Sequence, residues 1–370
     1  MADLLKNIFS KALVELIADA VDNVTIDFSK DKFLSKVFDK EWDKRELKQR
    51  TSHVTDIIIT YLSEDFKICA KQVMDMGDYF IDHNIYQFKN GTLALLFLPD
   101  IIEKQGIDFL EESVIAFKKI TPLISCEFGV RPFFIRYPKE MMSVVLKWAK
   151  DEDEHVRRLA SEGSRPRLPW GIALQAYKKN PDPLKELLET LKNDPSEYVR
   201  RSVANNLNDI SKDHPEWVID IANNWIGKTA ETDWIVKHAC RTLLKEGRSD
   251  VMEIFGYSSP KHFKISNFDV VTESVEIGDA LTFHFELNHL NEAQGKVRLE
   301  YGIYYLKKNG NHNRKVFKIS EKEMDGKTNL VIKRNQPFKV ITTRTFYTGE
   351  HFVSIIINGK EMQKKSFCLI

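Results

Sequence analysis

The chain has few of the features of a disulfide scaffold, a zinc ribbon or a membrane protein. Its 370 residues include four cysteines. They form no Cys-x-x-Cys pair, so we expect reduced thiols in a reducing compartment. No apolar run approaches the roughly 20 residues that span a membrane. Apolar residues at 4–17 recur at helical spacing among charges, which predicts an amphipathic core helix and not a signal peptide. We therefore expect a cytoplasmic protein with no membrane partner.

An excess of charge of one sign is also missing. The chain has 55 basic and 54 acidic residues, a formal net charge of +1, so it lacks the global basic signature of many nucleic-acid binders. Any DNA-binding surface must arise because basic side chains gather on one face. The length allows two domains, each with its own core.

Several kinds of active-site motif are absent. Gly227-Lys-Thr and Gly326-Lys-Thr lack the upstream glycine of a phosphate-binding loop, since Ala222 and Glu321 stand there. The chain contains no His-Glu-x-x-His and no Gly-x-Ser-x-Gly, and its ten histidines are scattered. These absences predict no metal site and no cofactor. They leave carboxylates, arginines and aromatic side chains as the candidates for function.

The hydrophobic pattern changes near residue 258. Before it, apolar residues recur every three or four positions, as in the segment 54–62, which is typical of helices. After it, short runs rich in β-branched and aromatic residues are separated by Gly/Asn/Asp clusters. We therefore predict a mostly α protein, with a helical domain at 1–257 and a small all-β immunoglobulin-like sandwich at 258–370.

The helical half contains a repeat. Asp153-Glu-His-Val-Arg-Arg-Leu-Ala aligns with Ser196-Glu-Tyr-Val-Arg-Arg-Ser-Val after 43 residues, and a third copy follows 37 residues later at Val236. These steps match the helix-pair units of HEAT-like α-α superhelical repeats, whose stacking creates a continuous concave surface. Acidic residues at the start of each repeated helix are expected to cap it and to complement its dipole.

Helix geometry separates a charged face from the apolar face of each repeat. Arg158 and Glu162 lie about 200° from the apolar positions, so we expect them to point away from the core. Arg201, Asn205 and Asp209 occupy the same register one repeat later. One interpretation is an intrahelical salt bridge, although arginine before the acid is the weaker orientation. The other is that the arginines bind phosphate while the acids serve a cationic ligand. For acids on a surface, amide substitutions should cost little stability.

A stiff loop follows the first repeated helix. Glu162-Gly-Ser-Arg-Pro-Arg-Leu-Pro-Trp170 combines two arginines, two prolines and a tryptophan. Arg165 and Arg167 are suited to grip phosphates. Trp170 either stacks on a base or sugar or packs into the core. The segment 126–134 is a second loop of this kind, with an acid, an Arg-Pro pair and aromatics.

At these residues the chain resembles the AlkC branch of the AlkC/AlkD family of bacterial DNA alkylation repair glycosylases. The resemblance rests on the segments 151–170 and 193–209 and covers the helical half. The string Arg-Pro-Arg-Leu-Pro-Trp is specific to the AlkC branch, whereas the Val-Arg-Arg repeats alone fit many HEAT proteins. A C-terminal immunoglobulin-like domain also occurs in that branch.

The resemblance implies a monofunctional glycosylase that acts as a monomer, without metal or cofactor, on double-stranded DNA with alkylated bases. Its substrates would be N3-methylated bases, chiefly 3-methyladenine and also 3-methylcytosine, removed without the base flipping used by most glycosylases. Such a base is already cationic and leaves without protonation. The enzyme need only stabilise an oxocarbenium-like sugar and position a water, which carboxylates can do.

The resemblance also implies roles for individual residues. Glu162 and Asp209 are the leading catalytic candidates, and Glu127 in the second loop is the third. Trp170 would pack against the sugar or the lesion. The DNA backbone would be held by arginines, namely Arg131, Arg158, Arg165, Arg167 and Arg201.

Two other functions stay open from the sequence. One is a non-catalytic HEAT-repeat scaffold that binds protein or DNA, and it predicts tolerance of substitution at Glu162 and Asp209. The other is a DNA-damage binder without catalysis, against which the retained acids argue. Incubation with methylated duplex DNA and analysis of the released bases distinguishes the three.

Overall fold

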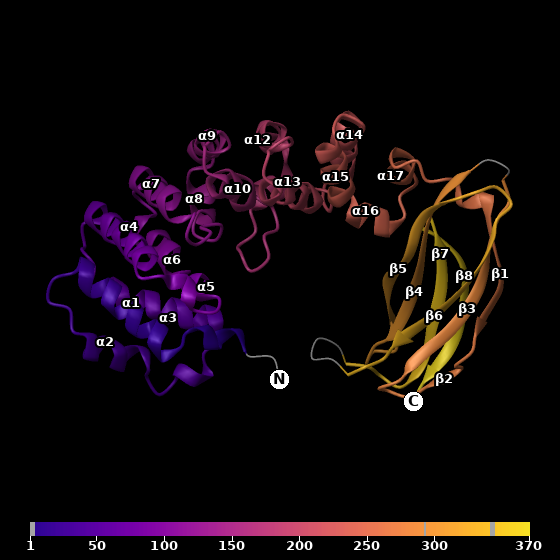
Figure 1. The fold of residues 1–370 in the computed structure, drawn as a ribbon, viewed down its shortest axis with the longest axis horizontal. Helices are drawn as coiled ribbons and strands as arrows, with labels where there is room; N and C mark the ends of the chain where they lie inside the picture. Colours follow the sequence, from indigo (N-terminus) through magenta and orange to yellow (C-terminus); the bar gives the residue numbers. More distant parts are fainter. Residues whose placement is uncertain (1–3, 292–293, 341–344) are drawn as a thin grey trace. The chain divides into compact units, whose positions relative to one another are not determined.

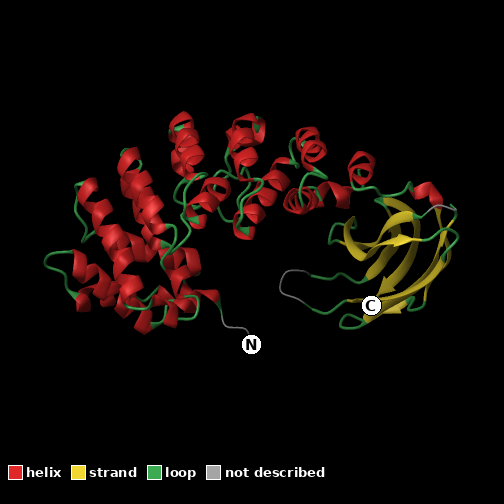
Figure 2. Cartoon of the chain, turned by 45° about the horizontal axis from the view of Figure 1, so that its top comes forward, coloured by secondary structure: helices red, strands yellow, loops and turns green. Residues whose placement is uncertain are grey.

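The computed structural model describes residues 4–291, 294–340 and 345–370. The chain forms two compact units, Met1–His214 with Ala230–Ile235 and Pro215–Thr229 with Val236–Ile370. Helices alone occupy the described chain up to Ile254, and strands begin at Phe263 (Figures 1 and 2). The predicted fold class is confirmed. The domain limit at 257/258 stays a prediction, because the second unit also includes most of the last helices.

The helices of the first unit are α1 (Lys11–Val24), α2 (Lys30–Val37), α3 (Leu47–Ile59), α4 (Phe66–Asp82), α5 (Gly91–Ala94), α6 (Phe97–Gly106), α7 (Leu110–Ile120), α8 (Arg131–Arg136), α9 (Pro138–Trp148), α10 (Glu154–Gly163), α11 (Gln175–Lys179), α12 (Lys185–Leu191) and α13 (Glu197–Ile210), with short 3-10 helices at Leu5–Ile8, Trp42–Lys44, Ile85–Gln87 and Asp182–Leu184. They are followed by α14 (Pro215–Trp225), α15 (Ala230–Ala239), α16 (Arg241–Glu246), α17 (Ser249–Ile254) and a 3-10 turn at Pro260–His262. No helix in the described part of the chain is long and apolar enough to cross a membrane.

The amphipathic segment at the N-terminus is not one helix. The hydroxyl of Ser10 accepts a hydrogen bond from the backbone of Leu13 at 3.3 Å and so begins α1. A separate 3-10 turn, Leu5–Ile8, precedes it. A serine inside a helical pattern favours a cap because its side chain satisfies an otherwise unpaired amide. The prediction of a single helix over 4–17 is therefore wrong at its first turn.

The predicted repeat forms α10 and α13, which pack against each other. In Figure 1, α4, α7, α9 and α12 lie along one side of the first unit, with α6, α10 and α13 along the other. The N-cap of α10 is Asp153, whose carboxylate accepts from the backbone of His155 at 2.7 Å. The predicted capping role of this acid is confirmed. Stacked helix pairs of this kind place the ends of successive inner helices side by side.

The first arginine of each Val-Arg-Arg repeat holds the turn before its own helix. Arg157 makes a two-pronged ion pair with Asp194 at 2.7 and 3.0 Å and donates to the carbonyl of Asp151 at 3.0 Å. In the next repeat, Arg200 donates to the carbonyls of Asp194 and Pro195 at 2.6 and 2.9 Å. Arg157 thus also links its repeat to the next one, and Arg158, the second arginine of that doublet, is left for the site.

The strands of the second unit form a two-layer sandwich (Figure 2). Within the described residues, one sheet has the order β1-β3-β6 and the other β2-β8-β7-β4-β5, with antiparallel pairing except between β2 and β8. Alternate side chains such as Phe283, Phe285 and Ile355 are fully buried between the sheets, as expected for this architecture. The strands are β1 (Phe263–Val270), β2 (Ser274–Val275), β3 (Ala280–His289), β4 (Gly295–Leu306), β5 (His312–Met324), β6 (Asn329–Pro337), β7 (Gly349–Ile357) and β8 (Lys360–Leu369).

Candidate active site

The three predicted catalytic acids converge around two arginines in the first unit. Glu162 lies in the last turn of α10, Asp209 in the last turn of α13, and Glu127 in the loop between α7 and α8. Arg158 forms ion pairs with Glu127 and with Glu162, the latter at 3.4 Å. Arg165 contacts Glu162 at 2.6 Å and Asp209 at 2.8 Å. Acids and arginines thus alternate in one continuous chain of ion pairs.

The expected surface position of two of these acids is wrong. The side chains of Glu162 and Asp209 are only 6% and 2% exposed, whereas that of Glu127 is 17% exposed. The face that turns away from the apolar core of α10 turns toward α13, where the hydroxyl of Ser202 donates to Glu162 at 2.6 Å. Buried charges of this kind cost several kcal/mol of stability to leave unpaired. We therefore expect amide substitutions at Glu162 and Asp209 to lower the free energy of unfolding, unlike substitutions on a surface.

The acids keep the two arginines charged despite burial. Burial lowers the pKa of Arg158, but the charges of Glu162 and Glu127 outweigh it and raise that pKa above its ordinary value. The same balance holds for the pKa of Arg165, raised by Glu162 and Asp209 against burial. Each guanidinium is therefore a fixed positive charge between two carboxylates.

Arg131 differs from the other arginines of the site. Its side chain is fully buried and donates to the carbonyl oxygens of Ile172 and, at 2.9 Å, Gly163. Burial and the nearby charge of Arg165 lower the pKa of Arg131 to about 10. Among the arginines predicted to face DNA, Arg131 and Arg165 instead lie inside the protein. Arg131 bonds to backbone carbonyls at and after the end of α10, and Arg165 bonds to the carboxylates of Glu162 and Asp209, so neither side chain extends to the surface.

Of the other predicted DNA-binding arginines, Arg158 is only 14% exposed and is paired with two of the acids, whereas Arg167 and Arg201 are more accessible. The side chain of Arg167 is 36% exposed and forms a two-pronged ion pair with Asp213 at 2.6 and 3.0 Å. Arg201 is 60% exposed and pairs with Glu197, one turn earlier in α13, at 2.5 Å. In α13 the intrahelical pair thus runs from acid to arginine, the more favourable orientation, and does not involve Asp209.

Trp170 lies on the surface. It is 64% exposed, so the alternative of a core-packed tryptophan is wrong. The residue occupies a turn before α11 and has a φ of +66°, in the left-handed region that non-glycine residues rarely adopt. An exposed indole on a constrained turn is available for stacking on a ligand.

Sequence reasoning missed several residues that complete the site. Arg158 donates to the hydroxyl of Ser125 at 2.6 Å, and that hydroxyl donates to Glu127 at 2.5 Å. The guanidinium of Arg158 also lies 5.0 Å from the centre of the Tyr198 ring. Tyr198 stands inside the repeat motif, so the sequence carried a signal that could have placed it near the site. The hydroxyls of Ser125 and Ser202 carry no signal that separates them from other serines.

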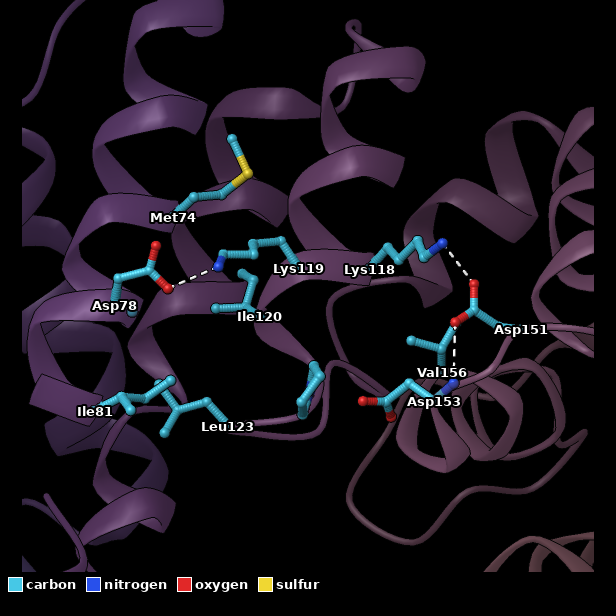
Figure 3. A pocket seen from close by; sticks show the side chains of 12 residues that line it. Met74, Asp78, Ile81, Lys118, Lys119, Ile120, Leu123, Asp151, Asp153 and Val156 are labelled. Carbon is cyan, nitrogen blue, oxygen red and sulfur yellow. Dashed lines mark hydrogen bonds and ion pairs between the residues drawn. The ribbon is translucent and has the colours of Figure 1, made fainter. Parts of the chain in front are cut away.

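A separate cavity of about 440 Å³ lies between α4, α7 and the start of α10 (Figure 3). Its rim carries the ion pairs Lys119–Asp78 at 2.7 Å and Lys118–Asp151 at 2.5 Å. None of the three candidate acids lines this cavity. Its walls are largely apolar and include Met74, Ile81, Ile120, Leu123 and Val156.

A buried acid–arginine chain at the ends of stacked repeat helices, together with an immunoglobulin-like sandwich, defines a helical-repeat protein with a C-terminal β domain, and both parts match known families. Residues 93–243 match the family model described as "DNA alkylation repair enzyme". Residues 256–370 match the model of the C-terminal Ig-like domain of the uncharacterised protein YhaZ. The two matches follow the division into helices and strands.

Two relatives resemble almost the whole chain. The uncharacterized protein YhaZ of Bacillus subtilis (strain 168) is 38% identical over 367 residues, 99% of each chain. The alkylpurine DNA glycosylase AlkC of Pseudomonas fluorescens, solved bound to DNA containing an abasic site analog, is 32% identical with a TM-score of 0.92 over 100% of both chains. The chain belongs to the AlkC-type family of DNA alkylation repair glycosylases.

Proposed function

We propose that this protein is a monomeric, monofunctional DNA glycosylase that removes cationic N3-alkylated bases, 3-methyladenine and 3-methylcytosine, from duplex DNA. The observation that carries the proposal is the chain of ion pairs that holds Glu127, Glu162 and Asp209 together through Arg158 and Arg165. The similarity of the whole protein to a DNA glycosylase solved bound to DNA containing an abasic site analog supports the same conclusion.

The reaction needs little from the protein beyond charge and position. An N3-alkylated base carries a positive charge, so when the N-glycosyl bond breaks it takes the bonding electrons and leaves neutral. The sugar becomes an oxocarbenium-like cation, water adds to its C1′ atom, and a carboxylate accepts the proton. The products are the free base and an abasic site. Preorganised negative charge stabilises the sugar cation in the transition state.

The differing exposure of the acids supports a division of labour among them. Glu127, the most exposed of the three side chains, is the first that solvent reaches, so we assign it the contact with water. Glu162 and Asp209 lie deeper, where the lower dielectric strengthens their field. Arg158 and Arg165 then orient the acids through their ion pairs.

The surface around the acids supports a DNA contact without an enclosed base pocket. Arg167 and Arg201 are exposed basic side chains that can exchange a surface acid for a phosphate. The exposed indole of Trp170 is available to pack against the sugar or the lesion. An enzyme that reaches the sugar from outside the duplex has no need to extrude the base.

The test is release of bases from methylated duplex DNA by the full-length protein. We expect free 3-methyladenine and intact DNA with abasic sites, at a rate that EDTA leaves unchanged. A Lys118→Met variant, altered at the separate cavity of Figure 3, serves as a control and should act like the wild type. Tight binding to an abasic analogue without base release would instead identify a damage binder, and no DNA affinity would favour a protein-binding scaffold.

A further inference from the structure

One lysine contacts both the loop that carries Glu127 and the turn that carries Trp170. Lys48, near the start of α3, donates to the carbonyl oxygen of Trp170 at 2.7 Å, across 122 positions of sequence. Its ammonium lies 5.3 Å from the ring centre of Phe128, the residue that follows Glu127. The sequence offers no sign of this contact, since Lys48 is one of many lysines on helix surfaces.

The Trp170 turn needs such support. A φ of +66° is disfavoured for a residue with a side chain, and it persists where the surroundings fix it. Arg131 fixes the carbonyl of Ile172, two residues further on, and the amide of Gly171 bonds to Leu168 at 3.1 Å. The backbone carbonyl of Trp170 itself accepts a hydrogen bond from Lys48 of α3.

Lys48 also lines a cavity of about 240 Å³. Asp100, Glu103 and Phe128 line it together with Lys48. Burial, then the charge of Asp100, raises the pKa of Glu103 to about 7, while Lys104 and Lys48 lower it. The ammonium of Lys48 thus lies beside acidic and aromatic groups, which attract a cation.

We propose that Lys48 is a positioning residue that locks the Trp170 turn against the Glu127–Phe128 loop, an inference that rests on the proposed function. The lock fixes the direction of the Trp170 indole and its separation from Glu127 before DNA arrives. Preorganisation of this kind acts on the rate of the chemical step more than on affinity. It differs from a phosphate contact, which acts on affinity and its salt dependence.

The test uses full-length protein labelled with 5-fluorotryptophan, with the Trp170 resonance identified by its loss in Trp170→Phe. Lys48→Met keeps the aliphatic stem and removes the donor and the charge, whereas Lys48→Arg keeps both. Lys32→Met, at an exposed lysine on α2, is the matched control. We expect the Trp170 resonance to shift or broaden in Lys48→Met alone, in the absence of DNA.

Single-turnover excision and binding to an abasic-analogue duplex complete the test. Lys48→Met should slow excision at saturating enzyme by on the order of 10-fold to 100-fold. Its Kd and salt slope should stay as in the wild type, and Lys48→Arg should restore most of the rate. An unchanged Trp170 resonance, or a weakened Kd with a flatter salt slope and a normal rate, overturns the proposal. If the wild type releases no base, the proposed function fails, while the resonance still decides whether Lys48 holds the turn.

Discussion

Arg165 joins two acids that belong to different repeats, and its Nε atom lies 2.8 Å from Asp209 Oδ2, 44 positions further along the chain. A loop residue therefore connects the last turn of α10 to the last turn of α13. Because both partners are buried, this contact bears on folding as much as on chemistry.

Asp209→Asn and Glu162→Gln should reduce both stability and activity. Each change removes one of the two carboxylates that pair with the buried Arg165, which should cost about 1–3 kcal/mol through the lost charged hydrogen bond. Each also removes negative charge that acts on the sugar cation, with a loss on the order of 10²–10³ in rate. Denaturant unfolding and single-turnover excision, at a temperature where each variant is folded, measure the two effects separately. Asp213→Asn, which breaks an exposed pair, should cost under about 1 kcal/mol. Wild-type excision by both folded variants would remove these acids from the mechanism.

The Arg165→Ala and Arg167→Ala variants should differ in whether they change DNA binding or stability. Arg167 is partly exposed, so its loss should weaken DNA binding for every sequence and lower the salt slope by about 1. Arg165 is buried between two acids, so its loss should lower the unfolding free energy and leave the slope of the folded protein unchanged. Binding isotherms at several salt concentrations, together with melting curves, distinguish the two. A flatter slope in Arg165→Ala would show that this arginine reaches phosphate after all.

A fragment ending at residue 257 should not keep all of its helices equally stable. In the second unit, Lys237 pairs with Glu321, and Lys296 donates to the carbonyl of Phe255 at 2.8 Å. Without residues 258–370, these contacts are lost and Tyr257, which is buried, becomes exposed. Hydrogen exchange should show normal protection up to α13 and faster exchange over 236–257. Uniform protection along the fragment would support an independent helical domain at 1–257.

The stability of the protein should depend on pH through Glu103. Its pKa rises from 4.5 to about 7 on folding, mainly through burial and then through Asp100, with Lys104 and Lys48 acting in the opposite direction. A raised carboxyl pKa means that ionisation opposes folding, so its penalty is absent below pH 4.5 and complete above pH 7. Glu103→Gln should therefore gain in melting temperature relative to the wild type between pH 5 and pH 8. An advantage independent of pH would contradict the shifted pKa.

The sequence predicted what depends on periodicity and spacing. The repeat at Val156 and Val199 predicted α10 and α13, and alternation after residue 258 predicted the sandwich. The burial of Glu162 and Asp209 was not predictable from helix geometry, because that geometry describes one helix and not the neighbour that covers its polar face. The contact of Lys48 was not predictable for a similar reason, since its partner is a backbone carbonyl 122 positions away in sequence.

The Val-Arg-Arg doublets show the same limit within a single motif. Helical spacing separates the two arginines of a doublet by about 100°, but it does not say which one holds the turn. Arg157 bonds to Asp194 in the turn before α13, and Arg158 bonds to Glu127 and Glu162, so the difference depends on the neighbouring segments and not on the doublet itself. The roles of the candidate residues in binding and catalysis stay predictions.

The burial of Glu162 also bears on how the protein is made. Its partner Ser202 is synthesised 40 residues after it, and Asp209, with which it shares Arg165, emerges later still. At 5–20 residues per second this interval lasts a few seconds, roughly 2–10 s. During that time Glu162 has its arginine partners Arg158 and Arg165 but lacks the hydroxyl of Ser202 and the helix that buries it. A nascent chain therefore cannot close this part of the core until α13 has left the ribosome, so a truncated product never acquires the site.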